Sequence, residues 1–575
     1  MGGSRSRRAF LRATAGAASV AASSSAAAAA SAPARASCSS APSPLLPVAR
    51  PPDRVFAHVE GERLVLERTR AGAWARGSVH VETRPDGDRL VVRTASEAPL
   101  RQVQLRWAVA VAPGLRILGD HWERGYGDLE WRGLVPERPM PWLFLTHDGR
   151  RTHGYGVRTG AGALAHWRLD AEGLSLFLDT RCGGRGVELG RRLLEAATVV
   201  AREGRDGESA FAAARALCAE LHDRPRLPAA PVYGGNSWYS AYDRIDADLI
   251  RAITDDVVAL SPAGGNRPFA VIDSGWQGAI GLHGAAGGPW REPNRLFPPM
   301  PRLAEEIRSK GARPGLWVRP LVTVDRVPDS WTLPASRFRG DYPGVVLDPS
   351  VPEALALVRE DVARLAREWN YDLVKHDFTT YDLFGRWGFE MGPSVTADGW
   401  SFADRTRTSA EIVRGLYSAL REAAGASLLI GCNTIGHLGA GFFELQRTGD
   451  DTSGREWERT RKMGVNTMAF RMPQHGTFFA ADADCAPVTK ALPWPLAERW
   501  LRLVAGSGTP LFLSHAREAL GPEQRAAVRE AFALAALPQP QAEPLDWLET
   551  TCPRRWRLGG REVSFEWTGE GGVEL

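Results

Sequence analysis

Cysteine is scarce and widely spaced in this chain, with six residues among 575. They are Cys38, Cys182, Cys218, Cys432, Cys485 and Cys552. Because no two of them form a CxxC pair, the spacing excludes a disulfide-rich scaffold and a thiolate metal or redox motif, and it leaves room for a single bridge. We therefore expect packing, rather than disulfides, to supply most of the stability.

Motifs of several other protein classes are also absent. There is no HExxH or EF-hand pattern, no GxSxG elbow and no glycine-rich phosphate loop, so nothing points to a zinc protease, a serine hydrolase or a nucleotide-binding enzyme. Beyond the first 36 residues, no apolar run approaches the roughly 20 residues that a membrane-spanning helix needs. We expect neither a metal nor an organic cofactor.

The rest of the composition is that of a folded, globular protein. Hydrophobic residues make up 44% and charged residues 24% of the chain, and 20 Trp and 20 Phe supply a large aromatic surface that a core can bury. A length of 575 residues exceeds one ordinary domain, so we expect two or three. Disorder is expected only at the N-terminus.

The N-terminus resembles a twin-arginine export leader. Residues 6–12 read SRRAFLR, and an Ala- and Ser-rich, weakly apolar stretch follows as far as Ala36. A small-x-small cleavage site at residues 34–36 would end this leader, and we expect a periplasmic or extracellular protein. An alternative is that Cys38 carries a lipid, although Arg35 stands where that signal has an aliphatic residue.

The leader also accounts for the positive charge of the chain. It holds five Arg and no acidic residue, and without it 66 basic side chains face 67 acidic ones. A nearly neutral mature protein gives no reason to propose a nucleic acid or an anionic membrane as a partner. The sequence does not indicate an oligomeric state.

Different hydrophobic patterns divide the chain into regions. Residues 37–53, rich in Pro, Ser and Ala, are a linker after the leader of residues 1–36. Residues 54–225 contain short alternating runs between Gly and Asp turns, which predict a β-sandwich-like domain. In residues 226–540 apolar runs alternate with amphipathic segments, which predicts an α/β fold with a parallel sheet, and residues 541–575 again look β-like.

Eight candidate strands in the α/β region predict a (β/α)8 barrel. They are Val232–Trp238, Phe269–Trp276, Pro314–Pro320, Asp372–Phe378, Ser427–Asn433, Phe443–Arg447, Thr477–Asp482 and Pro510–Ser514. Catalytic side chains of such barrels lie at the carboxyl ends of the strands, and here several of these ends are unusually polar.

Two of these ends carry the carboxylates that glycoside hydrolysis needs. Asp377 and Asp451 are 74 residues apart, which is two βα units, so both are expected at the same mouth of the barrel. Two carboxyl groups about 5–5.5 Å apart can cleave a glycoside through a covalent intermediate. Lys375 shares a strand face with Asp377, where its charge can keep that carboxylate ionised, and Arg447 would act likewise beside Asp451.

The ordered set of short motifs resembles glycoside hydrolase family 36 and the related family 27. The motifs are NSWY (236–239), IDSGW (272–276), GLW (315–317), KHD (375–377), CN (432–433), RTGDD (447–451) and SGTPL (507–511). The segment GDHWERGYGDL (119–129) is similar to the N-terminal domain of family 36. The resemblance covers most of residues 115–515.

The resemblance implies a retaining, exo-acting α-glycosidase of the α-galactosidase type that acts on a carbohydrate. By the spacing of the family motifs, the nucleophile is Asp377 and the general acid/base is Asp451, not its neighbour Asp450. The family pattern also implies that Asp273 binds sugar hydroxyls. It further implies that Trp238 and Trp276 cradle the sugar ring and that Cys432 lines the pocket.

The sequence departs from the family at Ser274, where members usually have a second acid. Other sugars therefore stay open, such as an α-N-acetylgalactosaminide or a β-L-arabinopyranoside, as does transfer to a sugar acceptor. A non-catalytic glycan-binding protein is the alternative of another class. We assign Asp482 and Asp484 to sugar contact or loop structure, because no His or third carboxylate accompanies them. We expect His376 to point away from the pocket.

Overall fold

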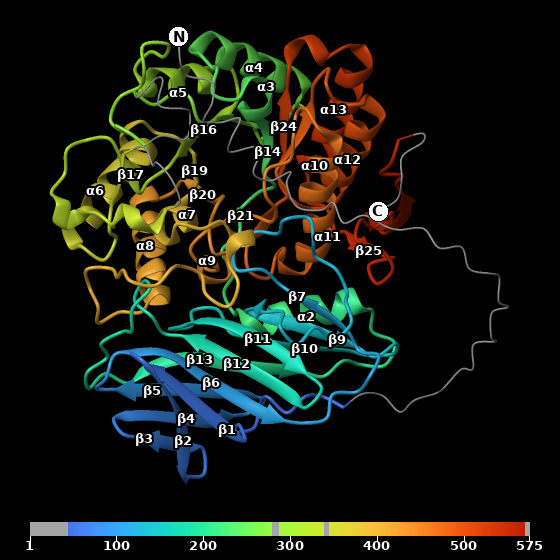
Figure 1. Ribbon diagram of the computed structural model, residues 1–575. Coiled ribbons are helices and arrows are strands. Elements are labelled where there is room, and N and C mark those ends of the chain that lie inside the picture. The colour runs from blue at the N-terminus through green and yellow to red at the C-terminus, as the bar shows by residue number, and fades with distance from the viewer. Residues whose placement is uncertain (1–43, 279–286, 339–343, 570–575) are drawn as a thin grey trace, which may run out of the picture. The chain divides into compact units, whose positions relative to one another are not determined.

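The computed structural model describes residues 44–278, 287–338 and 344–569 (Figure 1). The predicted leader, its cleavage site and Cys38 lie outside the described residues. The described chain begins with an antiparallel sheet, continues into a curled parallel sheet with helices, and ends in a small antiparallel sheet. No described helix is long and apolar enough to cross a membrane.

The N-terminal sheet has thirteen antiparallel strands in the order β7-β9-β10-β13-β5-β4-β3-β2-β1-β6-β12-β11-β8. They are β1 (Arg54–Val59), β2 (Glu62–Arg70), β3 (Ala73–Arg76), β4 (Val79–Asp86), β5 (Arg89–Ser96), β6 (Leu100–Ala108), β7 (Arg116–Gly119), β8 (Met140–Pro141), β9 (Leu143–His147), β10 (Thr152–Val157), β11 (Leu164–Asp170), β12 (Gly173–Asp179) and β13 (Leu194–Arg202). Alternating residues of β6 are buried, as expected for a sheet with one face on a core.

These strands form one continuous sheet rather than two separate ones, and the sheet folds back on itself. Phe144 of β9 and Trp167 of β11 lie near opposite ends of the strand order, yet their ring centroids are 5.5 Å apart. Trp142 joins the two ends. Its N–H donates to Ala165 of β11 at 3.0 Å, and its carbonyl accepts from Val157 of β10 at 2.9 Å. The two halves of this one sheet therefore enclose a buried aromatic layer, whereas the sequence predicted a sandwich-like domain.

One helix covers part of this sheet. Helix α2 (Ala210–Leu221) begins at Ser209, whose side chain accepts from the N–H of Ala212. Its buried side chains approach β10 closely because that strand has glycine where they pack. A Cβ at Gly154 would lie 2.9 Å from Leu217, and one at Gly156 would lie 2.8 Å from Leu221.

The parallel sheet has the strand order β22-β21-β20-β19-β16-β15-β14-β24-β23. Its strands are β14 (Tyr233–Asn236), β15 (Phe269–Ile272), β16 (Arg313–Val318), β19 (Leu373–His376), β20 (Leu428–Gly431), β21 (Leu445–Arg447), β22 (Ala480–Asp482), β23 (Cys485–Val488) and β24 (Leu511–His515). Each of the eight predicted segments overlaps one of these strands. The ninth strand, β23, was not predicted, because four residues with a central Pro read as a loop.

The two end strands of this sheet are neighbours in the chain. Only Ala483 and Asp484 separate β22, which pairs with β21, from β23, which pairs with β24. Asp484 makes the step between them with a φ of 69°. The sheet therefore curls until its ends meet.

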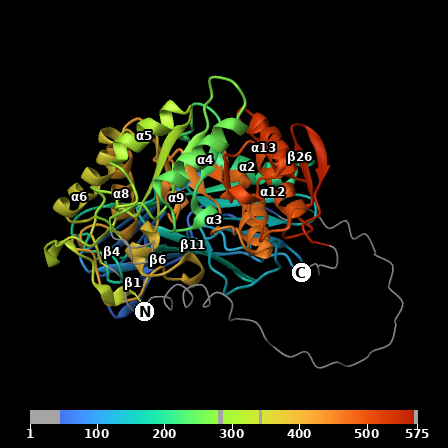
Figure 2. The ribbon, with the colours of Figure 1, turned by 90° about the horizontal axis from the view of Figure 1, so that it is seen from above.

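Helices follow the strands along the outer side of the sheet (Figure 2). The main ones are α4 (Ala247–Leu260), α5 (Met300–Ser309), α6 (Pro352–Ala363), α8 (Ser409–Ala424), α12 (Trp494–Gly506) and α13 (Pro522–Ala535). In α4, for example, Ile250, Ile253, Val257 and Leu260 are buried at helical spacing, and Asp246 caps the first turn. The alternating pattern of the sequence thus predicted the helices as well as the strands.

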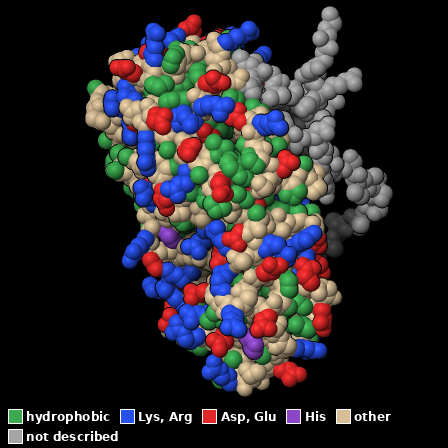
Figure 3. Space-filling model, turned by 90° about the vertical axis from the view of Figure 1, so that its left-hand side faces the viewer, with side chains coloured by type: hydrophobic (Ala, Val, Ile, Leu, Met, Phe, Trp, Pro, Cys, Tyr) green, Lys and Arg blue, Asp and Glu red, His purple; other side chains and the backbone are tan. Residues whose placement is uncertain are grey.

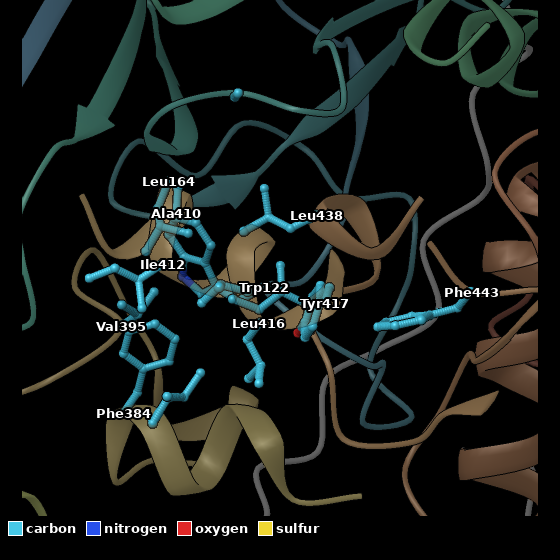
Figure 4. Close-up of a cluster of buried hydrophobic side chains, with 14 of the residues drawn as sticks. Trp122, Leu164, Phe384, Val395, Ala410, Ile412, Leu416, Tyr417, Leu438 and Phe443 are labelled. Atoms are coloured by element: carbon cyan, nitrogen blue, oxygen red, sulfur yellow. The ribbon is translucent and has the colours of Figure 1, made fainter. Parts of the chain in front are cut away.

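The two large sheets share one hydrophobic core. Figure 4 shows Trp122 and Leu164 of the N-terminal region beside Ile412, Leu416 and other side chains of the α/β region, all from a single buried cluster. The N-terminal region and the α/β region therefore belong to one compact unit, Ser43–Leu575.

The C-terminal sheet is small and antiparallel. It consists of β25 (Glu543–Pro544), β26 (Arg555–Leu558) and β27 (Arg561–Ser564). Trp556 is fully buried, and the indole N–H of Trp457 donates to the carbonyl of Trp567 at 2.7 Å. This segment therefore packs on the α/β region.

The described cysteines form no disulfide, and charges of both signs share the surface. Within the described ranges, all five cysteines are free and buried. On the face shown in Figure 3, Lys and Arg are interspersed with Asp and Glu, and neither sign dominates.

Candidate active site

Most of the predicted site residues stand at the carboxyl ends of the parallel strands. Asp273 directly follows β15. Lys375 lies near the end of β19, and Asp377 directly follows that strand. Cys432 directly follows β20, and Arg447 is the last residue of β21. Since these strands are parallel and adjacent, their carboxyl ends meet at one edge. The structure thus brings these side chains to one mouth.

A buried ion pair occupies the centre of this group. The ammonium of Lys375 lies 2.7 Å from Oδ2 of Asp273, and both side chains are almost fully buried. The amide of Asn236, at the end of β14, donates to the same oxygen at 2.9 Å. Burial alone would lower the pKa of Lys375, but the charges around it, with that of Asp273 the largest, together outweigh burial and raise the pKa. The pair is therefore a fixed set of donors and acceptors for a polar ligand.

Asp377 is partly exposed and held by two N–H donors. The indole N–H of Trp317 donates to Oδ2 at 3.2 Å, and the backbone N–H of Phe378 donates to Oδ1 at 2.7 Å. Burial would raise the pKa of Asp377, but the charges of Arg124 and Lys375, with these hydrogen bonds, outweigh burial and lower the pKa. The carboxylate is ionised at neutral pH.

The pKa of Asp451 is shifted in the opposite direction, upward. Its Oδ1 lies 3.1 Å from the guanidinium of Arg447, and its side chain is 39% exposed. Desolvation by the surrounding protein raises this pKa, and the positive charge of Arg447 lowers it. The negative charges of Asp450 and Asp484 add to the increase, so the net shift is upward. The two carboxyl groups are thus pushed toward different protonation states, as an acid and a nucleophile require.

Arg447 forms ion pairs with two aspartates at the connection between β22 and β23. Its guanidinium, 2% exposed, lies 3.4 Å from Asp482 and 2.7 Å from Asp484 in addition to its contact with Asp451. Asp484 also accepts hydrogen bonds from Tyr239 and Thr452. Asp482 and Asp484 therefore position Arg447. Within the described ranges, no three His, Cys, Asp or Glu side chains could together hold a metal ion.

The two predicted cradle tryptophans differ in their surroundings. Trp276 is fully buried, packs against Trp290 and Trp369, and donates its N–H to the carbonyl of Trp317 at 2.9 Å. It has no free face for a sugar ring, so we do not assign it a stacking role. Trp238 is partly exposed at the start of α3 (Trp238–Ala241), with its ring edge-on to Tyr242.

Cys432 and His376 are both buried. The backbone N–H of Cys432 donates to the carbonyl of His376 at 3.0 Å. Burial raises the pKa of the Cys432 thiol, which is therefore neutral. The His376 ring packs against Phe443 and Tyr417, away from the charged group, as the alternation of the strand predicts.

The N-terminal domain contributes a charged residue that the sequence did not assign to the site. Arg124, 3% exposed, lies 2.9 Å from Oδ1 of Asp450 and 3.1 Å from Glu123. Its charge acts on both Asp377 and Asp451, and lowers the pKa of each. The signal was present in the GDHWERGYGDL segment, but its place in space depends on how the domains pack.

Backbone and side-chain hydrogen bonds fix this segment against the α/β region. The N–H of Gly125 donates to the carbonyl of Thr448 at 2.8 Å, and the N–H of Asp450 donates to the carbonyl of Gly125 at 3.0 Å. The Glu123 carboxylate accepts from the amide of Asn433 at 2.6 and 2.8 Å. The loop that carries Arg124 is therefore attached to the α/β region on both sides of Arg124.

No protein-family model matches the chain, and no curated protein matches it. Solved structures do match it. The α-galactosidase TtGalA from Thermus thermophilus, solved with p-nitrophenyl α-D-galactopyranoside, has a TM-score of 0.58 at 21% identity, covering 89% of this chain and 99% of that one. The family 36 α-galactosidase AgaA from Geobacillus stearothermophilus has a TM-score of 0.56 at 13% identity, covering 84% and 75%.

A third structure, the α-galactosidase from Lactobacillus brevis, has a TM-score of 0.55 at 14% identity and covers 84% of this chain and 72% of that one. The chain therefore has the fold of a glycoside hydrolase. More narrowly, it has the fold of the α-galactosidases of glycoside hydrolase family 36, which confirms the resemblance at the level of the fold. The chemistry has to be argued from the site itself.

Proposed function

We propose that the protein is a retaining, exo-acting α-glycosidase of the α-galactosidase type. Asp377 is the nucleophile and Asp451 the general acid/base, and the curled sheet is a (β/α)8 barrel with β22 and β23 sharing the seventh place. The observation that carries the proposal is the difference in surroundings of the two carboxyl groups. Two N–H groups donate to Asp377 and nearby positive charges lower its pKa, whereas Asp451 pairs with Arg447 and desolvation raises its pKa.

The chemistry follows a double displacement. The ionised carboxylate of Asp377 attacks the anomeric carbon while Asp451 donates its proton to the departing oxygen. Asp451, now ionised, then takes a proton from water, which attacks the same carbon and releases Asp377. The sugar leaves with its original anomeric configuration. Asp273, Lys375 and Asn236 supply the donors and acceptors for the sugar hydroxyls.

One observation favours a substrate sugar other than galactose. Ser274 stands where family members usually have an acid, so this position carries no charge. Its side chain is buried, and its hydroxyl accepts from the amide of Gln277 at 3.2 Å. A neutral residue there favours the alternatives of an α-N-acetylgalactosaminide or a β-L-arabinopyranoside, or a sugar as acceptor. A non-catalytic glycan-binding protein would have no use for two carboxyl groups with opposite pKa shifts.

Two measurements test this proposal. A panel of aryl α- and β-glycosides identifies the sugar, and NMR of the first product tells retention from inversion. A slowly hydrolysed fluorinated glycoside of that sugar should add its mass to the peptide that contains Asp377. Inversion, or labelling of another residue, would contradict the assignment. We also propose export through the twin-arginine pathway, which the SRRAFLR motif supports and cell fractionation tests.

A further inference from the structure

A row of aromatic side chains begins beside the nucleophile and reaches the surface. It consists of Phe378, Tyr381, Trp387, Phe389 and Tyr126, which we call the aromatic platform. The first three and Tyr126 are partly exposed, and Phe389 is 52% exposed. Large aromatic side chains at a protein surface usually serve a binding purpose when they are contiguous.

The ring contacts of the platform form two groups, which the backbone at Gly388 and the guanidinium of Arg124 join. The ring of Phe378 lies edge-on to Trp387 with centroids 5.5 Å apart, and Trp387 stacks on Tyr381 at 4.4 Å. Phe389 lies edge-on to Tyr126 at 5.1 Å, and the N–H of Gly388 donates to the hydroxyl of Tyr126 at 3.1 Å. Residues from α7 (Thr379–Phe384), from the segment after it and from the N-terminal domain thus form one surface.

The inner end of the platform is joined to the nucleophile through a strained backbone. Phe378 has a φ of 63°, a left-handed conformation that bulky residues rarely adopt. This conformation accompanies the hydrogen bond from its N–H to Asp377, and its ring lies edge-on to Trp317 at 6.5 Å. The same residue therefore holds the nucleophile and begins the platform.

The platform also lies beside an arginine that is paired with Asp450, the residue before the proposed acid. Arg124, which is paired with Asp450, has its guanidinium carbon 5.7 Å from the ring centroid of Trp387 and 5.9 Å from that of Tyr126. The acid protonates the group that leaves, so this group must lie on the side of Asp451. The charged cluster of Asp273 and Lys375 suits the hydroxyl groups of the sugar that stays.

We infer that the aromatic platform binds the leaving group of the substrate, and that it selects leaving groups with a flat apolar face. Such a face is offered by an aryl group and by one side of a second pyranose ring. The inference rests on the proposed function and deepens it, because it names the chemistry of the part of the substrate that the sequence left open.

The test compares substrates that share a sugar and differ in the leaving group. An aryl glycoside and a disaccharide present a ring to the platform, whereas a glycosyl fluoride of the same sugar presents none. The ratio of kcat/KM for the aryl glycoside to that for the fluoride should fall about tenfold in Trp387→Ala. It should fall less in Phe389→Ala and recover in Trp387→Phe. A parallel fall for the disaccharide identifies a sugar ring, and a fall for the aryl glycoside alone identifies an aryl group.

Controls separate this inference from the proposed function. Trp494→Ala removes another partly exposed tryptophan, at the start of α12, and should keep both ratios of the wild type. If Trp387→Ala does not fold, as judged by circular dichroism, Phe389→Ala decides, because that side chain is mostly exposed. Unchanged ratios in the platform variants, with a wild type that cleaves the fluoride, overturn the inference alone. A wild type that cleaves no glycoside or fluoride overturns the proposed function and the inference with it.

Discussion

Arg124 of the N-terminal domain and Asp450 of the loop after β21 form an ion pair with 2.9 Å between nitrogen and oxygen. Asp450 precedes the proposed acid/base, and Arg124 supplies the first of the charges that lower the pKa of the proposed nucleophile. Arg459 binds the other oxygen of Asp450 at 2.8 Å. The N-terminal region therefore influences both carboxyl groups although it lies outside the parallel sheet.

Replacing the nucleophile should abolish turnover. In Asp377→Ala no covalent intermediate can form, so kcat should fall by several orders of magnitude, while azide restores part of the activity. Asp372→Ala, at the other end of the same strand, is the matched control and should keep kcat near that of the wild type. Full activity of Asp377→Ala would remove the mechanism.

The acid/base variant should discriminate between leaving groups. Asp451→Asn should slow a disaccharide on the order of 1,000-fold, yet affect a dinitrophenyl glycoside much less, because a good leaving group needs no proton. Asp450→Asn should show no such selectivity. If instead Asp450→Asn is the selective variant, the acid role belongs to Asp450.

Removing Arg124 should move the whole pH profile. Its positive charge lowers the pKa of Asp377 and of Asp451, so Arg124→Ala should shift both the acid and the alkaline limb of kcat/KM to higher pH. Asp450→Asn removes a negative charge beside Asp451 and should shift the alkaline limb to lower pH. Arg132→Ala, which removes an exposed arginine paired with Glu130, should leave both limbs in place.

Removing the buried ammonium should weaken binding of the transition state. Lys375→Met keeps the aliphatic stem but leaves Asp273 without its ion-pair partner, so kcat/KM should fall on the order of 100-fold. Circular dichroism should show a folded protein with a lower Tm. Lys310→Met, a surface control beside Asp255, should change neither quantity much. Wild-type kcat/KM in Lys375→Met would limit Lys375 to a structural role.

Asp484 should make stability depend on pH in the acid range. Its pKa is lowered from 3.8 to about 2 despite burial, mainly by the charges of Arg447 and Lys375. The folded state therefore gains stability from Asp484 above about pH 4 and loses it as the pH falls toward 2. Asp484→Asn should lower the free energy of unfolding in urea by about 3 kcal/mol at pH 7, and less near pH 3. A difference that is independent of pH would refute this account.

Much of the fold could be predicted from local pattern. The eight predicted segments overlap strands of the parallel sheet because apolar runs and amphipathic helices alternate with different periods. β23 escaped prediction, since its short sequence with Pro487 reads as a loop and only its pairing with β24 makes it a strand. The N-terminal domain was predicted as a sandwich, but its single continuous sheet depends on the turn at Trp142.

Part of the candidate site could likewise be predicted from the sequence, and part depends on the tertiary structure. The sequence by itself predicted that Asp273, Lys375, Asp377, Arg447 and Asp451 lie near one edge, because polar side chains at the ends of neighbouring strands in a parallel sheet share that edge. Only the tertiary structure decided that the charge of Arg124 acts on Asp377 and Asp451, that Trp276 is buried, and in which direction the pKa of each carboxyl group shifts. Charge interaction and desolvation depend on distance in space, which local sequence does not encode.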